Sequence, residues 1–246
     1  MSSKVETSLA VLEILRDCST ALGMTQRIFA SLNVYRDSDS RSAALNMGID
    51  EALLETAGTP SIRFYKWDHP ALSFGYFGKF SDVMSYSAER DLVRRWTGGG
   101  IVLHGDDLTY SIVLPATDRA FSESSTSIYE TIHKALRAAL AANGQSAELA
   151  MNGAPKISES CFANPVRADV FLNGNKIAGA AQRRTRRGLL QQGSIQNVTI
   201  CNDFPERFAN ELGDVIKHID LDAALRARAA DIAEQKYATR AWLERR

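Results

Sequence analysis

The sequence predicts an α/β (α+β) domain built on a mixed, mainly antiparallel sheet that is flanked by helices. Segments with one apolar helical face alternate with groups of short strand-like runs, and several of these runs are joined by hairpin-type turns. The regular strand–helix–strand alternation of a parallel sheet does not occur in the sequence. The composition agrees, since 45% hydrophobic and 24% charged residues among 246 provide for a core and exclude disordered, collagen-like and coiled-coil chains.

The first 28 residues are interpreted as an N-terminal appendage, and residues 29–246 as a single domain. A short helix is expected in the appendage, where four apolar residues are suitably spaced: Leu9, Val11, Leu12 and Leu15. Charged residues interrupt this stretch, which a secretory signal peptide would not show, and the sequence has no run of about 18 apolar residues to span a bilayer. We therefore expect a cytoplasmic protein with no membrane partner.

The first helix of the domain is predicted over residues 40–56. Leu45, Ile49 and Leu53 recur at helical spacing and share one face, and Ser40 is suited to cap the start. The apolar face is expected to pack into the core.

The remaining elements are assigned from the same signals, namely apolar periodicity for each helix or strand and turn-forming residues at its ends. They are strands over 62–67, 71–74 and 109–114, a helix over 127–142, a hairpin over 169–182 that turns at Asn173-Gly174, a strand region over 189–199, a helix that starts at 203–205, and a closing helix over 221–243.

Charge and cysteine content exclude several kinds of partner. Lys and Arg number 29, and so do Asp and Glu, so no overall positive field exists to hold nucleic acid. The cysteines are an odd number at wide spacing, Cys18, Cys161 and Cys201, with no Cys-x-x-Cys pair. Neither a disulfide framework nor a metal site is therefore expected.

A run of three glycines, Gly98-Gly99-Gly100, is the most distinctive local feature. Glycines allow backbone groups to approach a ligand closely, although a flexible turn is the simpler interpretation of such a run. The common nucleotide, metalloprotease and serine-hydrolase signatures do not occur in the sequence. The meaning of the glycine run therefore depends on the residues around it.

Those residues form two ordered motifs. The first is R-R-W-T-G-G-G-I-V-L-H over 94–104, followed by D-L-T-Y-S over 107–111. The second comprises C-F-A-N-P-V over 161–166, N-K-I-A-G-A-A-Q-R over 175–183 and Q-Q-G-S-I over 191–195. Together they resemble the lipoate-protein ligase and octanoyltransferase family, whose catalytic domain is related to that of biotin-protein ligases. The resemblance covers about residues 32–242 and implies the fold of that catalytic domain.

The resemblance is closest to the cysteine-type octanoyltransferases. In these enzymes a nucleophilic cysteine in a Cys-Phe pair precedes a Gly-x-Lys-Ile-x-Gly-x-Ala-Gln motif, and Cys161 and Lys176 stand in that relation here. The implied activity is transfer of an octanoyl or lipoyl group from acyl carrier protein, through a thioester on Cys161, to a lysine of a lipoyl-domain protein. The implied acceptors are the glycine cleavage H protein or the E2 component of 2-oxoacid dehydrogenases, and no cofactor is implied.

Two alternatives remain open at this point. An ATP-dependent lipoate-protein ligase would act through lipoyl-AMP and would require ATP and Mg²⁺; the three consecutive glycines are closer to that group, since transferases often have Gly-Gly-Arg there. A non-catalytic protein that binds lipoyl domains or lipoate is the second alternative, because Gln192 stands where both enzyme groups usually have histidine.

The candidate catalytic residues are Cys161 and Lys176. A free thiol has a pKa of about 8.5 and needs a neighbouring cation to react as a thiolate at neutral pH. A lysine ammonium supplies that cation, and it also stabilises the negative charge that develops on the acyl oxygen. Substrate-binding roles are implied by the motifs for Arg95, Thr97, Gly98, Gly99, Gly100, Val102, His104, Gly179, Ala180, Gln182, Gly193 and Ser194.

Other residues that can carry chemistry have simpler interpretations. The arginines of a basic cluster, Arg183, Arg184, Arg186 and Arg187, are typical of a solvated loop, and docking of an acidic carrier protein is the alternative. Structural roles are expected for Cys18, Cys201, His69, His133 and His218. Met47 is expected in the core, and the resemblance implies that its helix borders the acyl tunnel.

Overall fold

The computed structural model describes residues 27–153, 161–162 and 164–245. Its main sheet has eight strands, of which β11 and β1, and β1 and β2, pair in parallel, while all other neighbours are antiparallel. Across the sheet the order is β11 (Gly213–His218), β1 (Phe29–Arg41), β2 (Ser61–Trp67), β6 (Leu108–Pro115), β10 (Gly188–Ile195), β9 (Asn175–Arg184), β8 (Val170–Leu172) and β7 (Glu148–Leu149). The expectation of a mixed, mainly antiparallel sheet is confirmed.

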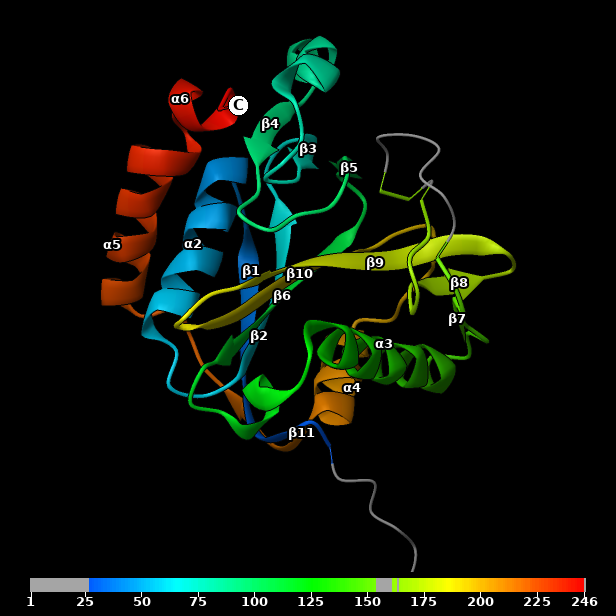
Figure 1. Ribbon diagram of the computed structural model, residues 1–246. Coiled ribbons are helices and arrows are strands. Elements are labelled where there is room, and N and C mark those ends of the chain that lie inside the picture. The colour runs from blue at the N-terminus through cyan, green and yellow to red at the C-terminus, as the bar shows by residue number, and fades with distance from the viewer. Residues whose placement is uncertain (1–26, 154–160, 163, 246) are drawn as a thin grey trace, which may run out of the picture.

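A second, three-stranded sheet lies beside β9 and β10 (Figure 1). Its central strand β3 (Ala71–Phe74) runs parallel to β4 (Asp91–Arg94) and antiparallel to β5 (Val102–His104). The glycine run of the first motif connects β4 to β5. This small sheet therefore brings the first motif close to the strands that carry the second.

Helices cover both faces of the main sheet, as Figure 1 shows. α2 (Ala43–Thr56) and α5 (Ala223–Ile232) pack with a cluster that includes Tyr65 and Leu190 on one face. On the other face, α3 (Ser125–Ala142) and α4 (Phe204–Leu212) contribute to the largest cluster. The chain closes with a π-helical segment, Ala233–Tyr237, and α6 (Arg240–Leu243), and single 3₁₀ turns occur at Phe80–Asp82, Met84–Ala88 and Arg119–Ser122.

The predicted hairpin is confirmed as β8 and β9. Its turn residues Asn173 and Gly174 have φ angles of 51° and 78°, the left-handed conformation that a tight hairpin turn requires. Helix α3 begins at Ser125, two residues before its predicted start, because the Ser124 side chain caps the backbone N–H of Ser127.

Several expectations need correction. The helix expected from Ser40 begins at Ala43, where Ser42 is the capping residue, because residues up to Arg41 continue strand β1. The closing helix expected over 221–243 is divided into α5, the π-helical segment and α6. The short helix expected in the N-terminal appendage, together with Cys18, lies outside the described residues.

Within the described part of the chain, no helix combines the length and apolar character needed to cross a membrane.

Candidate active site

A narrow cavity of about 30 Å³ lies between the small sheet, α2 and the strands β9 and β10. It is lined by Met47, Tyr65, Trp67, Ser73, Arg95, Val102, His104, Thr109, Cys161, Gly179, Ala180, Ala181, Gln192, Gly193 and Ser194. Both sequence motifs therefore contribute to one cavity.

The two candidate catalytic residues meet at the wall of this cavity. The Lys176 ammonium donates to the backbone carbonyl of Cys161 at 2.9 Å and lies 3.9 Å from the Cys161 sulfur. The backbone N–H of Cys161 donates to the carbonyl of Ile101 at 2.9 Å, which attaches the cysteine to the segment after the glycine run. The geometry thus places a thiol beside a cation, as the sequence predicts.

A buried carboxylate fixes the position of the lysine. Lys176 Nζ lies 2.7 Å from the Asp169 carboxylate, which is fully buried and which also accepts from the Tyr129 hydroxyl and the Val166 N–H. Burial and the Asp169 charge raise the pKa of Tyr129, so this hydroxyl stays protonated and remains a donor. Gly179 leaves the space that the ammonium occupies, because a Cβ at this position would lie 2.8 Å from Lys176 Nζ.

The glycine run surrounds the Arg95 guanidinium. Arg95 Nη2 donates to the carbonyls of Gly98 at 3.1 Å and Gly100 at 2.8 Å, and Gly99 between them has a φ of 85°. The loop therefore directs backbone oxygens at Arg95, and these three glycines are not among the residues that line the cavity. Burial lowers the pKa of Arg95, and the nearby Cys161 charge opposes that shift.

His104 is held at both ring nitrogens. Its Nδ1 lies 2.8 Å from the Asp107 carboxylate and its Nε2 lies 2.6 Å from the Ser73 hydroxyl, while the Trp67 ring stacks on the imidazole with centroids 4.1 Å apart. Burial lowers the pKa of His104 despite its hydrogen bond with Asp107, so the ring is neutral at pH 7.

Gln192 is held by partners on both sides. Its Oε1 accepts from the Thr97 hydroxyl at 2.8 Å, and its Nε2 donates to the buried Asp50 carboxylate at 2.7 Å. Thr97 does not line the cavity itself, but its hydrogen bond helps to fix the orientation of Gln192, which does. Gln182 also lies outside the cavity wall and donates to Gln191 at 2.7 Å.

The cavity contains most of the residues expected from the motifs and several that were not. The expected residues that line it are Cys161, Arg95, Val102, His104, Gly179, Ala180, Gly193 and Ser194. Sequence reasoning missed Ser73, which lines the cavity, and two carboxylates behind its wall, Asp107 and Asp169. Ser73 and Asp169 lie outside the two motifs, whereas Asp107 begins the D-L-T-Y-S part of the first motif and was given no role. Met47 does line the cavity, as its helix was expected to do.

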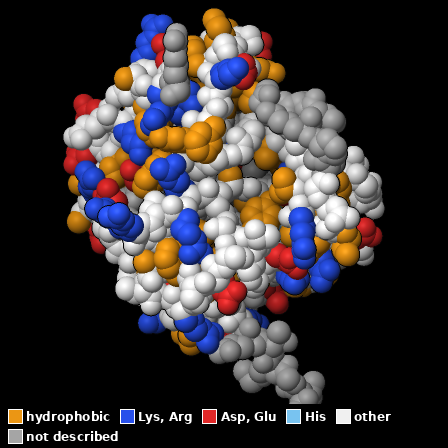
Figure 2. Space-filling model, in the orientation of Figure 1, with side chains coloured by type: hydrophobic (Ala, Val, Ile, Leu, Met, Phe, Trp, Pro, Cys, Tyr) orange, Lys and Arg blue, Asp and Glu red, His pale blue; other side chains and the backbone are white. Residues whose placement is uncertain are grey.

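The four clustered arginines do not form one uniform patch. Arg183 stacks on Tyr76 and Trp96, and Arg184 donates to the carbonyls of Phe121 and Glu123. Figure 2 shows Lys and Arg side chains gathered over the β9–β10 hairpin and the nearby C-terminal helices, with a few acidic side chains among them.

The histidines and the exposed cysteine that were given structural roles lie away from the cavity. His133 is fully buried between the Ala168 carbonyl at 2.6 Å and the Tyr110 hydroxyl at 3.2 Å. His218 is half-exposed beside Glu206, and Cys201 is exposed. None of these residues lines the cavity.

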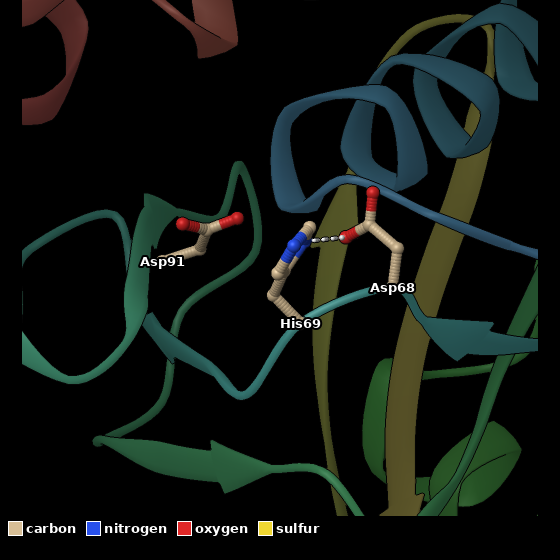
Figure 3. Close-up of side chains that lie close together, drawn as sticks. All are labelled: Asp68, His69 and Asp91. Carbon is tan, nitrogen blue, oxygen red and sulfur yellow. Dashed lines mark ion pairs between the residues drawn. The ribbon is translucent and has the colours of Figure 1, made fainter.

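Asp68, His69 and Asp91 form an exposed group at the start of β3 and β4, with ligand atoms within 4.8 Å of one another (Figure 3). His69 Nδ1 lies 3.1 Å from the Asp68 carboxylate. Exposed groups of this kind form surface ion pairs, and we interpret the cluster in that way.

Comparison with known proteins agrees with this geometry. The family model described as the lipoyl protein ligase A/B catalytic domain matches residues 42–218. The octanoyltransferase LipM of Oceanobacillus iheyensis is 37% identical over 170 residues, which cover 65% of this chain and 62% of the relative. LipM of Carboxydothermus hydrogenoformans is 39% identical over 170 residues, covering 65% of this chain and 63% of the relative. The chain thus spans somewhat less than two thirds of the length of these relatives.

Solved structures show the same fold. A lipoate-protein ligase A bound with ATP is 22% identical, with a TM-score of 0.68 over 88% of this chain and 98% of the other. The bipartite lipoate protein ligase of Thermoplasma acidophilum, whose structural study includes its E2 lipoyl domain, is 19% identical, with a TM-score of 0.65 over 88% of this chain and 96% of the other. Because the family model matches the larger part of the chain, this protein belongs to the lipoyl protein ligase A/B catalytic domain family.

Proposed function

We propose that this chain transfers an octanoyl or lipoyl group to a lysine of a lipoyl-domain protein and holds the group meanwhile as a thioester on Cys161. The observation that carries this proposal is the position of Cys161 at the cavity wall, with the Lys176 ammonium 3.9 Å from its sulfur and 2.9 Å from its carbonyl oxygen. The identity to octanoyltransferases supports the same class of reaction.

In the first half-reaction the Cys161 thiolate attacks the carbonyl carbon of a thioester donor. A new carbon–sulfur bond forms to Cys161, the donor's carbon–sulfur bond breaks, and the donor leaves as a thiol after taking one proton. The Lys176 ammonium stabilises both the thiolate and the charge on the acyl oxygen. One thioester replaces another, so the step is nearly isoenergetic and requires no nucleotide or other cofactor.

In the second half-reaction the uncharged amine of an acceptor lysine attacks the Cys161 thioester. The carbon–nitrogen bond forms, the bond to the Cys161 sulfur breaks, and the amine loses one proton. The product amide is more stable than the thioester, which drives the transfer. We propose acyl carrier protein as the donor, and the H protein or an E2 lipoyl domain as the acceptor; the E2 lipoyl domain studied with the T. acidophilum ligase supports that acceptor class.

We place the reaction in one catalytic domain from residue 29 to 246 and in the cytoplasm. The free thiols of Cys161 and Cys201 support this location, because a reducing compartment keeps such thiols unpaired and able to react. The arrangement of both motifs around one cavity supports the single domain.

The rival function is an ATP-dependent ligase, which the fold shared with the ATP-bound ligase favours. The test supplies a lipoyl-domain acceptor either with octanoyl acyl carrier protein alone or with free lipoate, ATP and Mg²⁺, and measures the acceptor's mass. We expect modification with the first donor and no need for nucleotide. Modification of the acceptor only with lipoate, ATP and Mg²⁺ would establish the ligase. If neither donor leads to a modified acceptor, the remaining function is that of a non-catalytic binding protein.

A further inference from the structure

A hollow of about 950 Å³ lies at the end of the molecule where α6 approaches the small sheet. It is bordered by residues 76–81, which follow β3, and by Glu244 and Arg245, which follow α6. None of these residues lines the cavity that contains Cys161, and the proposed reaction uses none of them. The hollow is therefore a separate feature of the surface.

A buried arginine holds the two walls of this hollow together. Arg94 is 1% exposed, and its guanidinium donates to the carbonyls of Tyr76 at 2.9 Å and Gly78 at 2.6 Å on one wall. On the other wall it donates to the carbonyls of Leu243 and Arg245 at 2.9 Å each. The hollow is thus formed before any partner binds, which lowers the entropic cost of docking.

Cations that lack a carboxylate partner surround the hollow. The Arg183 and Arg245 guanidiniums lie over the Tyr76 ring, 4.9 and 4.4 Å from its centroid, and Lys79 is exposed on the wall. In the part of the chain that the structure describes, none of these three cations forms an ion pair. The carboxylate among the lining residues, Glu244, is already paired with an arginine of α6 at 2.7 Å. The surface is therefore positively charged.

An exposed aromatic side chain stands among these cations. Phe77 is 85% exposed, the largest fraction for a large hydrophobic side chain in the described residues, and its ring packs edge-on against Tyr76 with centroids 5.0 Å apart. Aromatic and arginine side chains are the groups that contribute most to protein–protein binding. Figure 2 shows basic and hydrophobic side chains side by side near the C-terminal helices. We call Tyr76, Phe77, Lys79, Arg183 and Arg245 together the α6 surface.

The α6 surface lies directly behind the glycine run of the first motif. The Tyr76 N–H donates to the Thr97 carbonyl at 2.8 Å, and a Cβ on Gly75 would overlap the Gly99 carbonyl oxygen. The segment after the run reaches Cys161, whose N–H donates to the Ile101 carbonyl. The glycine run therefore separates the α6 surface from the segment that carries the thiol.

The order of strands in the small sheet gives the scale of this separation. The α6 side is attached to β4, where the Trp242 ring N–H donates to the Arg94 carbonyl at 2.9 Å, and Cys161 is attached next to β5. Strand β3 lies between β4 and β5, as Figure 1 shows. Neighbouring strands are about 4.8 Å apart, so the α6 surface lies on the order of 10 Å from the thiol.

This separation distinguishes the two protein substrates of the proposed reaction. An acceptor lysine carries its amine on a short side chain, so the acceptor domain must sit directly over Cys161. A carrier protein instead holds its acyl thioester at the end of a long flexible arm. It can dock beside the small sheet while the thioester reaches the thiol.

We propose that the α6 surface docks the donor, acyl carrier protein. The proposal rests on the proposed function. Acyl carrier proteins are acidic, so the unpaired cations complement their charge, and Phe77 supplies an apolar contact at the centre. The guanidiniums of Arg183 and Arg245 also suit the phosphodiester that links the arm to the carrier.

The test measures acylation of Cys161 from two donors. Octanoyl acyl carrier protein is compared with octanoyl-pantetheine, which has the same thioester but neither protein nor phosphate, and the adduct on Cys161 is followed by mass spectrometry. Phe77→Ser/Arg245→Ser is expected to lower the second-order rate constant with the carrier protein about 10-fold or more, the usual effect of removing dominant interface side chains. The rate with octanoyl-pantetheine is expected to stay at the wild-type value, because the cavity is intact.

Val215→Ser/Lys217→Ser is the matched control. It also removes one exposed hydrophobic side chain and one exposed cation, but from β11, at the opposite end of the molecule from α6 (Figure 1). Both double variants change exposed positions, so melting temperatures close to that of the wild type are expected. The control is expected to be acylated from both donors at wild-type rates.

Single variants separate the charged contact from the apolar one. Arg245→Ser is expected to flatten the dependence of the carrier-protein rate on salt, because exposed charges act through screened attraction. Phe77→Ser is expected to lower that rate and to leave its salt dependence unchanged. General damage to the fold would instead slow octanoyl-pantetheine as well.

Transfer from preloaded Cys161 to a lipoyl domain is followed separately and is expected to be unchanged in Phe77→Ser/Arg245→Ser. Normal loading of this variant from the carrier protein would overturn the docking proposal. A defect confined to transfer would assign the surface to the acceptor, and a wild-type dimer that dissociates in the variant would assign it to a second copy of the chain; either result overturns the proposal.

The wild type distinguishes failure of the docking proposal from failure of the proposed function. An adduct on Cys161 from octanoyl-pantetheine but none from octanoyl acyl carrier protein would overturn the docking proposal alone. No adduct from either donor would overturn the proposed function, and the docking proposal with it.

Discussion

Lys176 and Asp169 form a buried ion pair with 2.7 Å between the ammonium nitrogen and a carboxylate oxygen, and their side chains are 3% and 0% exposed. The pair lies directly behind Cys161 and determines where the lysine charge is placed. The chemistry of the thiol therefore depends on a carboxylate that does not line the cavity.

Asp169→Asn is expected to be strongly destabilising, because it leaves a buried ammonium without its counter-charge. Removing one partner of a buried pair costs about 3–5 kcal/mol in the free energy of unfolding. Urea unfolding of this variant beside Glu130→Gln, which breaks an exposed pair with Lys134, measures the effect. Similar stabilities for the two variants would show that the Lys176–Asp169 pair does not have this role.

Gly179→Ala is expected to impair acylation of Cys161 with a smaller effect on stability. The new Cβ would lie 2.7 Å from Lys176 Cε and 2.8 Å from Nζ, so the ammonium must leave its position beside the Cys161 sulfur and the Asp169 carboxylate. Gly58→Ala is the control, since a Cβ at that position meets nothing within 4 Å. The initial rate of adduct formation from octanoyl acyl carrier protein measures the difference, and equal rates in both variants would contradict the prediction.

His133 is expected to make the fold sensitive to acid. Burial lowers its pKa to about 4, whereas the unfolded chain binds a proton near pH 6.5, so the unfolded state binds more protons as the pH falls. The stability is complete above pH 6.5 and declines between pH 6.5 and about 4, by about 3 kcal/mol in total. Urea titrations at several pH values check this prediction; a stability that does not change over this interval, in wild type and in a folded His133→Asn variant alike, would refute it.

Arg186 and Arg187 are expected to contribute to docking of an acidic protein substrate. Both side chains are exposed, and the Arg187 guanidinium lies 3.5 Å from the Glu55 carboxylate, a long ion-pair distance. Replacing both with serine is expected to raise the KM for the protein substrates and flatten its dependence on salt, because exposed charges act over about 8 Å at physiological ionic strength. Arg240→Ser, which removes an exposed arginine on α6, is the control. If the double variant has the same KM and the same salt dependence as the wild type, Arg186 and Arg187 belong to a solvated loop and do not contribute to docking.

Parts of the fold were predictable because their signals are local. Helix α3 and the β8–β9 hairpin follow from apolar periodicity and from the turn at Asn173-Gly174. Strand β1 was missed because its last six residues, Arg36–Arg41, are all polar, and parallel pairing with β2 positions them only in the folded chain. The closing helix was overextended because helical spacing alone revealed neither the π-helical turn nor the new start of α6 after its capping residue Thr239.

The site was predictable to the extent that its residues lie within motifs. Cys161 and Lys176 are adjacent as expected, although 15 positions separate them in the sequence. Ser73, Asp107 and Asp169 were not identified, since a single polar residue in or after a strand shows its partner only in three dimensions. The structure shows that the carbonyls of Gly98 and Gly100 accept from Arg95, which the sequence did not indicate, and the approach of the glycine N–H groups to a ligand stays a prediction.

The covalent intermediate on Cys161 is the central claim, and peptide mass spectrometry tests it most directly. Wild-type protein and Cys161→Ala are incubated with octanoyl acyl carrier protein in the absence of nucleotide, digested and compared. The account predicts an octanoyl thioester on the peptide that contains Cys161 in the wild type, and no adduct in the variant. An unlabelled wild type that still modifies a lipoyl domain, or a variant that transfers octanoate at the wild-type rate, would contradict it.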